Sequence, residues 1–98
     1  MADLSITHER NGSRGEYRAC SDEHGRDCGH LTWFEASPGV RVADHTFVPP
    51  SLRGGGIAAK LVEAMVADAR TEGFSIRPQC SYVAAAFRRH PGWSDVRA

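Results

Sequence analysis

The sequence predicts an α/β fold of the α+β kind, with a four-stranded antiparallel meander followed by helix, strand and helix. Apolar and polar residues alternate with the period of a strand over much of residues 4–48. From residue 56 the period becomes that of a helix. A helix between the fourth and fifth strands allows those two strands to run parallel. With 98 residues, the chain is expected to form one domain over residues 1–98.

The first three strands are predicted from short alternating segments and the turns between them. Residues 4–8 and 17–19 alternate, and residues 11–13 (Asn-Gly-Ser) form a turn between them. Residues 21–27 are all polar or glycine, so we expect a hairpin loop there. Residues 28–35 then form the third strand.

A fourth strand is predicted over residues 40–48, after a turn at residues 37–39 (Ser-Pro-Gly). Strict alternation would place five side chains on one face of it: Val40, Val42, Asp44, Thr46 and Val48. Pro49-Pro50 should end the strand, because proline has no N–H to donate to the ladder.

The second half of the chain should contain a long helix, a short strand and a short helix. The helix is expected over Gly56–Glu72, and Gly73 suits its C-terminal end. Its apolar stripe consists of Ile57, Leu61, Met65 and Ala69. Residues 74–78 read as a strand, and Ser81 can cap a helix over residues 82–89.

Composition excludes several classes of function. Twelve basic residues balance twelve acidic ones, which argues against an electrostatic nucleic-acid binder and against a polybasic membrane anchor. The N-terminus has no apolar signal segment, and no apolar run approaches the length of a membrane span. Three cysteines, an odd number, do not suggest a disulfide framework. We therefore expect a cytoplasmic protein that binds neither nucleic acid nor membrane.

The most informative segment is the glycine loop, in which Arg53 precedes three consecutive glycines, Gly54, Gly55 and Gly56, at the start of the long helix. Glycine lets the backbone approach a ligand closely. The first N–H groups of a helix have no intrahelical partner, and the helix dipole adds partial positive charge there. The segment therefore predicts an anion site, most naturally for a phosphate or pyrophosphate.

Two nucleotide-binding motifs fit this loop poorly. A dinucleotide fingerprint needs repeated βαβ units and an acidic residue about 20 positions further on. Residues 73–94, where that residue would lie, contain no Asp or Glu. A P-loop needs Ser or Thr after its lysine, and Lys60 is followed by Leu61. A glycine-rich loop that only turns the chain is the remaining alternative.

The loop together with its surroundings resembles the small, single-domain members of the GNAT-type N-acetyltransferases. Residues 53–58 (Arg-Gly-Gly-Gly-Ile-Ala) match that family's pyrophosphate loop, Arg/Gln-x-x-Gly-x-Gly/Ala. The segments Asp44-His45-Thr46, 78–84 (Pro-Gln-Cys-Ser-Tyr-Val-Ala) and 88–91 (Arg-Arg-His-Pro) resemble the subfamily's other signatures. Asp44 departs from the threonine that is common there. The resemblance covers residues 40–93, whereas residues 1–39 match only in strand order.

This resemblance implies how acetyl-CoA or coenzyme A would bind. The end of the fourth strand, at Thr46, Phe47 and Val48, would pair with the pantetheine arm. Arg53 and the backbone N–H groups of the loop would hold the pyrophosphate. Those groups belong to Gly54, Gly55, Gly56, Ile57, Ala58 and Ala59. The thioester would lie near Cys80 and the start of the second helix, at Ser81 and Tyr82, and Arg88 could reach a phosphate.

Two residues are candidates for the chemistry of acetyl transfer. Cys80 should lie at a helix N-terminus, which favours a thiolate that could accept the acetyl group. It could equally be a structural cysteine that lines the cofactor cleft. Histidine is a residue type that can deprotonate an amine, so His45 is a candidate base, or it packs at the sheet surface without a catalytic role. Tyr82 is a further candidate, as an acid for the leaving thiolate, although an aromatic side chain on a helix is more often core.

Metal binding is a weak alternative use of the remaining cysteines. Cys20, His24, Cys28 and His30 are residue types that bind zinc, but their spacing is not that of a structural zinc site. We therefore expect no metal and interpret these residues as incidental to a strand-loop-strand segment.

The sequence thus predicts an N-acetyltransferase that moves an acetyl group from acetyl-CoA to an amine, either directly or through Cys80. The acceptor, a small molecule or a protein, is not specified. A CoA-binding module without transferase activity is the main alternative, and an α/β interaction domain is a third. Open sheet edges make either a monomer or a weak homodimer conceivable.

Overall fold

The computed structural model describes residues 4–21 and 28–98. The elements follow in the predicted order: β1 (Leu4–Asn11), β2 (Arg14–Ser21), β3 (Cys28–Ser37), β4 (Val40–Phe47), α1 (Ile57–Glu72), β5 (Ser75–Pro78) and α2 (Ser81–Arg89). Two short 3-10 helices, Pro50–Leu52 and Pro91–Val96, follow β4 and α2. The fourth strand ends at Phe47, one residue earlier than predicted, and Val48 and the paired prolines follow it.

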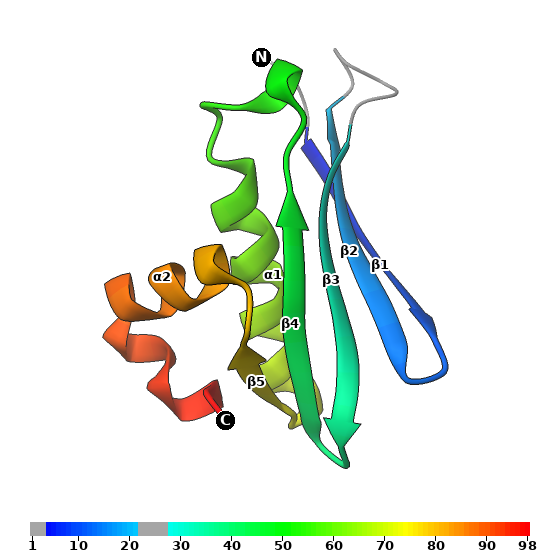
Figure 1. Cartoon of the computed structure of the whole chain (residues 1–98), viewed down its shortest axis with the longest axis vertical. Coiled ribbons are helices and arrows are strands. Elements are labelled where there is room, and N and C mark those ends of the chain that lie inside the picture. The colour runs from blue at the N-terminus through cyan, green and yellow to red at the C-terminus, as the bar shows by residue number, and fades with distance from the viewer. Residues whose placement is uncertain (1–3, 22–27) are drawn as a thin grey trace.

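The five strands form one sheet in the order β1-β2-β3-β4-β5. The first three pairings are antiparallel, and β4 pairs with β5 in parallel. This confirms the predicted fold class. Both helices lie against the same side of the sheet, so the part of the chain that the structure describes forms two layers, and within it the other side of the sheet carries no helix (Figure 1). We call this uncovered side the open face.

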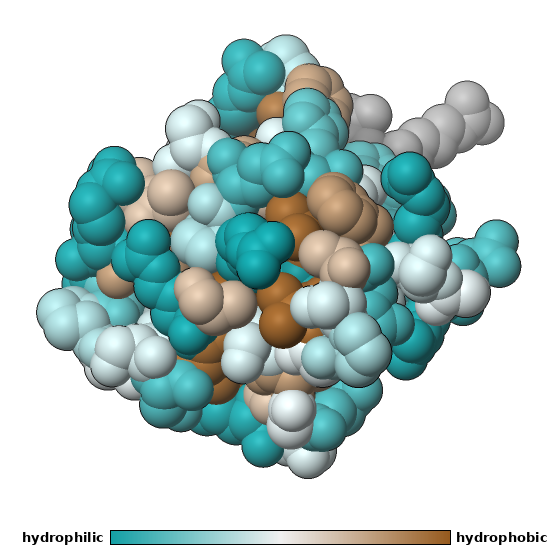
Figure 2. Space-filling model, turned by 60° about the horizontal axis from the view of Figure 1, so that its bottom comes forward, coloured by the Kyte–Doolittle hydropathy of each residue, from teal (hydrophilic) through white to brown (hydrophobic). Residues whose placement is uncertain are grey.

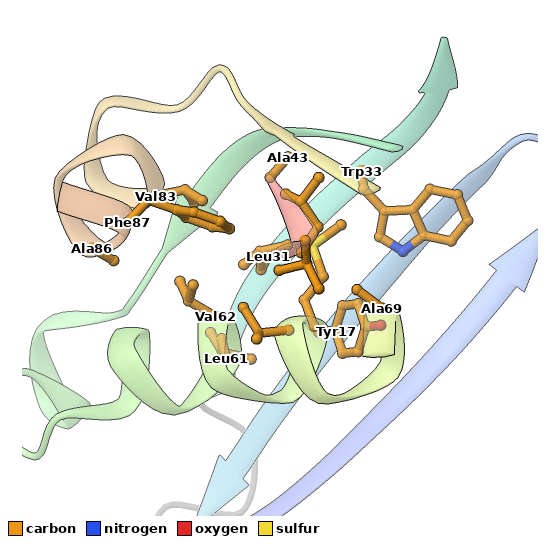
Figure 3. Packing of buried hydrophobic residues seen from close by; sticks show 14 of the residues in the cluster. Tyr17, Leu31, Trp33, Ala43, Leu61, Val62, Ala69, Val83, Ala86 and Phe87 are labelled. Atoms are coloured by element: carbon orange, nitrogen blue, oxygen red, sulfur yellow. The ribbon is translucent and has the colours of Figure 1, made fainter. Parts of the chain in front are cut away.

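The core lies between the sheet and the two helices (Figure 3). Tyr17, Leu31 and Trp33 from the sheet are almost completely buried, as are Leu61 of α1 and Val83 of α2. Burial of such apolar side chains is the main source of stability in a domain of this size. The whole predicted stripe of α1 belongs to this core: Ile57, Leu61, Met65 and Ala69 are all buried. Figure 3 shows α1 and α2 contributing side chains to the same cluster.

The faces of β4 differ from the prediction. Thr32 of β3 pairs with His45, but the next residue, Trp33, pairs with Ala43, so Asp44 is an extra residue in a β-bulge. Ala43 and Thr46 therefore both share the face of the buried core residues Trp33 and Leu31, their strand partners. The expectation that Val42, Asp44 and Thr46 share one face is wrong, because strict alternation cannot anticipate an inserted residue.

The cysteine count also led to a wrong expectation. Cys20 and Cys28 form a disulfide, with their Cα atoms 4.4 Å apart, at the last paired position of β2 and β3. An odd number of cysteines still allows one pair, and Cys80 is free. His24 lies outside the described residues, and the Nδ1 atom of His30 lies 3.4 Å from Glu16. Within residues 4–21 and 28–98, no cluster of three or more His, Cys, Asp or Glu side chains could hold a metal.

The surface is mostly polar on the side that Figure 2 presents, where hydrophobic side chains appear as small patches between hydrophilic ones. Ile6 and Phe47 are large hydrophobic residues that remain exposed. None of the helices in the described part of the chain is long and apolar enough to cross a membrane.

Candidate functional site

The candidate site lies where β4 and β5 separate. Their parallel pairing ends at Ala43 and Pro78. The N–H groups of Gln79 and Cys80 then both donate to the Ala43 carbonyl oxygen, at 3.1 and 3.0 Å. Beyond this point β4 passes through its bulge and continues to Phe47, while the other chain segment turns into α2. The bulge and the end of β5 therefore open the sheet at one place.

Two neighbouring hollows extend from this place to the glycine loop. One, of about 270 Å³, is lined by Thr46, Phe47, Val48, Arg53, Ala58 and Tyr82. The other, of about 200 Å³, is lined by Val48, Leu52, Arg53, Gly54, Gly56, Ile57, Ala58 and Tyr82. They share Val48, Arg53, Ala58 and Tyr82, so we treat them as one channel and call it the β4–α1 groove.

The glycine loop forms one end of this groove. Gly54 and Gly56 have φ values of 89° and 73°, a backbone region that residues with a Cβ rarely adopt. Gly56 is the N-cap of α1, and the first intrahelical bond runs from the Lys60 N–H to the Gly56 carbonyl. The N–H groups of the preceding residues therefore have no partner within the helix. No acidic residue occupies the first turn of α1, so nothing there opposes an anion.

Arg53 connects the glycine loop to the end of β4 through a hydrogen bond. Its Nε donates to the Val48 carbonyl oxygen at 3.0 Å, and its side chain lines both hollows. The guanidinium group is therefore held beside the start of α1. This places a positive charge next to the partial positive charge of the helix terminus.

Cys80, the N-cap of α2, lines neither hollow, but it lies beside Thr46, which does line the groove. Its Sγ is 3.7 Å from the Thr46 hydroxyl oxygen across the gap between the strands. Burial alone would raise the pKa of the Cys80 thiol. Hydrogen bonds from the Val83 backbone, the Thr46 hydroxyl and the Tyr82 backbone outweigh this, and the pKa falls below its ordinary value. The site therefore stabilises the thiolate relative to that of an ordinary cysteine. The expectation that Ser81 caps α2 is wrong by one residue.

The two residues before Thr46 lie at the bulge. His45 is exposed and pairs with Thr32, so its side chain lies on the open face. The Asp44 carboxylate accepts a hydrogen bond of 2.8 Å from the Thr32 hydroxyl. It also borders a hollow of about 360 Å³ that is lined by Glu9, Arg10, Asn11, Arg14, Gly15, Glu16, Thr32, Trp33 and Asp44. Asp44 thus lies between this hollow and the place where the sheet opens.

The predicted cofactor residues divide into two groups. Nine line the β4–α1 groove: Thr46, Phe47, Val48, Arg53, Gly54, Gly56, Ile57, Ala58 and Tyr82. Four do not line it: Gly55, Ala59, Ser81 and Arg88. Arg88 is exposed in the last turn of α2, away from the start of that helix. Leu52 also lines the groove, but we did not predict it as a site residue. Its position as an apolar residue directly before Arg53 was a signal that could have identified it.

The sequence model of the GCN5-related N-acetyltransferases matches residues 16–96. The chain belongs to the GCN5-related N-acetyltransferase family. The match includes β3, β4, both helices and the whole of the β4–α1 groove. This match confirms the family that the sequence predicted.

A solved structure resembles this GCN5-related chain along its full length. It is the NMR structure of a GCN5-like protein from Staphylococcus aureus, at 22% identity and a TM-score of 0.69. The match covers 100% of this chain and 91% of the other. At this level of identity the resemblance shows the common fold.

Proposed function

We propose that this GCN5-related protein transfers an acetyl group from acetyl-CoA to an amine. One observation carries the proposal. The β4–α1 groove runs from the N-terminus of α1, whose first N–H groups have no partner within the helix, to Thr46. The Thr46 hydroxyl in turn contacts Cys80, whose thiol has a lowered pKa. A long cofactor with phosphates at one end and a thioester at the other matches this arrangement. Membership of the family supports the same reaction.

In this proposal the pyrophosphate binds at the N-terminus of α1. The N–H groups of Gly54 to Ala59 supply hydrogen bonds, and Arg53 supplies charge. The pantetheine arm follows the groove past Val48 and pairs with the backbone near Thr46. Tyr82 borders the arm from the other side of the groove.

The surroundings of Cys80 favour a covalent route. The thiolate attacks the thioester carbonyl, the acetyl group moves to Sγ, and the CoA thiolate leaves. The amine then attacks the acetylated Cys80 and releases the thiolate. Direct attack of the amine on acetyl-CoA is the alternative route, and it needs no acetylated intermediate.

In both routes the amine must lose a proton. His45 can accept that proton from the open face, as we predicted from the sequence. Asp44 is a second candidate, because the bulge places its carboxylate beside the opening of the sheet. We propose that the acceptor approaches from the open face, opposite to the side on which α1 holds the donor.

Cofactor binding and transfer can be tested separately. Calorimetric titration with acetyl-CoA should give saturable binding, and Arg53→Ala should weaken it by about tenfold, the factor that corresponds to losing one charge-assisted hydrogen bond. Arg14→Ala removes the same charge from the open-face hollow and should leave the affinity unchanged. Absence of binding by the unmodified protein would overturn the proposal.

Transfer to a panel of amines, peptides and proteins then separates an acetyltransferase from a CoA-binding module. Without acceptor, intact-mass measurement after mixing with acetyl-CoA tests the covalent route, which requires acetylated Cys80. Normal turnover by Cys80→Ala would exclude that route and leave direct attack.

Size-exclusion chromatography would distinguish the predicted monomer from a weak homodimer.

A further inference from the structure

The Cys20–Cys28 disulfide lies at the end of the sheet where β2 ends and β3 begins. This is the same end of the molecule as the loop between β4 and α1 (Figure 1). The two cysteines are the last paired residues of the β2–β3 ladder. End pairs of a ladder open most readily, because they have neighbours on one side only. A covalent bond at this position therefore restrains the segment that is otherwise the first to open.

The segment held by the disulfide supports the β4–α1 groove directly. Gly29 follows Cys28, and a Cβ placed on Gly29 would lie 2.9 Å from Cγ2 of Ile57 and 3.4 Å from Cδ1 of Leu61. It would also lie 3.5 Å from the Phe47 carbonyl oxygen. The start of β3 therefore touches both the first turn of α1 and the end of β4. Ile57 and Phe47 are themselves lining residues of the groove.

The next residue of β3 continues this connection. His30 pairs with Phe47 at the end of the β3–β4 ladder. Loosening of β3 at Cys28 would thus reach two of the elements on which the cofactor rests, the end of β4 and the N-terminus of α1. Because the anion-binding N–H groups must keep their orientation, such loosening reduces preorganisation of the site.

We infer that Cys20 and Cys28 form a redox-sensitive clamp that tightens the cofactor site when it is oxidised. The inference rests on the proposed binding of acetyl-CoA. The structure supplies the clamp (the disulfide), the contact (Gly29 against Ile57) and the responding site (the groove). If the protein is cytoplasmic, as predicted, its disulfide belongs to a class that is usually transient and redox-sensing.

The Cys20–Cys28 disulfide can be reduced and reformed by thiol–disulfide exchange with small thiols and disulfides. A dithiol reductant attacks one sulfur, forms a mixed disulfide, and then closes to its own cyclic disulfide as it releases the second cysteine. The products are two protein thiols and one oxidised reductant. A low-molecular-weight disulfide reverses the reaction through two exchanges and releases two small thiols. Cys20 and Cys28 are both partly exposed, which permits attack.

The test uses the full chain with Cys80→Ser, so that Cys80 cannot contribute to any redox effect. The oxidised form is compared with the same chain carrying Cys20→Val and Cys28→Val, which keep an apolar cross-strand pair but lack the bond. The probe is acetyl-CoA, because free CoA carries a thiol that could itself attack the disulfide. Calorimetry gives the affinity, and hydrogen exchange at residues 28–31 and 57–61 reports on the contact.

We expect the chain without the disulfide to remain folded, to bind acetyl-CoA about fivefold more weakly and to exchange faster in both segments. Reducing the disulfide of the Cys80→Ser chain should produce the same change, and the Val pair should be insensitive to reductant. Equal affinities with and without the bond would overturn the clamp while the proposed function stands. Failure of the unmodified, oxidised protein to bind acetyl-CoA would overturn both.

Discussion

At the scale of single residues, Cys80 shows how neighbours decide reactivity. It is partly buried, and burial by itself opposes ionisation of a thiol. Backbone N–H groups at the start of α2 and the Thr46 hydroxyl reverse that effect. The sequence indicated the helix terminus, but Thr46 lies 34 positions earlier in the chain, so its contact with Cys80 depends on the tertiary fold.

The lowered pKa of Cys80 predicts its rate of alkylation. Because the thiolate is the reactive species, iodoacetamide should modify Cys80 with a midpoint below the pKa of an ordinary thiol, about 8.5. Thr46→Val should move the midpoint upward, whereas Thr46→Ser keeps the hydroxyl and should not. Under non-reducing conditions the disulfide protects Cys20 and Cys28, so mass spectrometry reports on Cys80. A midpoint at or above that of a free thiol would contradict this prediction.

His8 makes stability depend on pH. Its Nε2 accepts a hydrogen bond of 3.0 Å from the Trp33 indole, and its ring stacks on Tyr17. Burial lowers the pKa of His8, and the charges of Arg41 and Arg10 act in the same direction, against those of Asp68 and Glu72. The unfolded chain therefore binds a proton more readily than the folded one. As the pH falls below about 6.5 and towards the lowered pKa, the free energy of unfolding should decrease.

Urea denaturation followed by tryptophan fluorescence measures this effect. The loss of stability between about pH 7 and about pH 5 should shrink in His8→Gln, which keeps an acceptor for Trp33 but does not titrate. An equal loss of stability in both proteins would assign the pH dependence to other groups.

At the scale of elements, the β4–α1 connection combines a strand end, a glycine loop and a helix start. The sequence located each of these parts, because prolines, glycines and helical periodicity are local signals. The bulge in β4 had no such signal. It depends on how β4 pairs with β3, and it decides that Thr46 lies on the side of the core while His45 lies on the open face.

The glycine loop should tolerate alanine at one position and resist it at the next. Gly56 has a φ of 73°, so Gly56→Ala should lower the free energy of unfolding by about 1–2 kcal/mol. A Cβ on Gly55 would be 3.6 Å from the Leu52 carbonyl oxygen, which is an ordinary contact. Gly55→Ala should therefore change stability by less than about 0.5 kcal/mol. Equal effects in urea denaturation would show that the backbone at Gly56 is not restricted as described.

At the scale of the whole molecule, two layers leave the sheet open on one side. The two helices share one core with the inner side of the sheet (Figures 1 and 3). The open face carries His45 and the hollow beside Asp44. The chain end also joins the sheet, because the Ala98 N–H donates to the Ile76 carbonyl beside β5. A domain of this size buries a modest share of its surface, so a ligand can contribute noticeably to its stability.

Binding of acetyl-CoA should therefore raise the melting temperature in a concentration-dependent way. At a ligand concentration of about 100 times Kd, the added stability is about 2.7 kcal/mol. Arg53→Ala should shift the whole curve of melting temperature to higher ligand concentration, and Arg14→Ala should not. Differential scanning fluorimetry is sufficient to measure both curves. A melting temperature that does not respond to saturating acetyl-CoA would contradict the proposed cofactor.

The sequence by itself determined the order of the elements, the glycine loop, the family and most of the residues that line the groove. These features are local, since each rests on periodicity or on residues that are close together in the chain. Only the tertiary structure decided the bulge at Asp44, the contact between Thr46 and Cys80, and the disulfide between Cys20 and Cys28. Each of these depends on which strand residues face one another, and pairing across strands is fixed by the packing of the whole sheet rather than by local sequence.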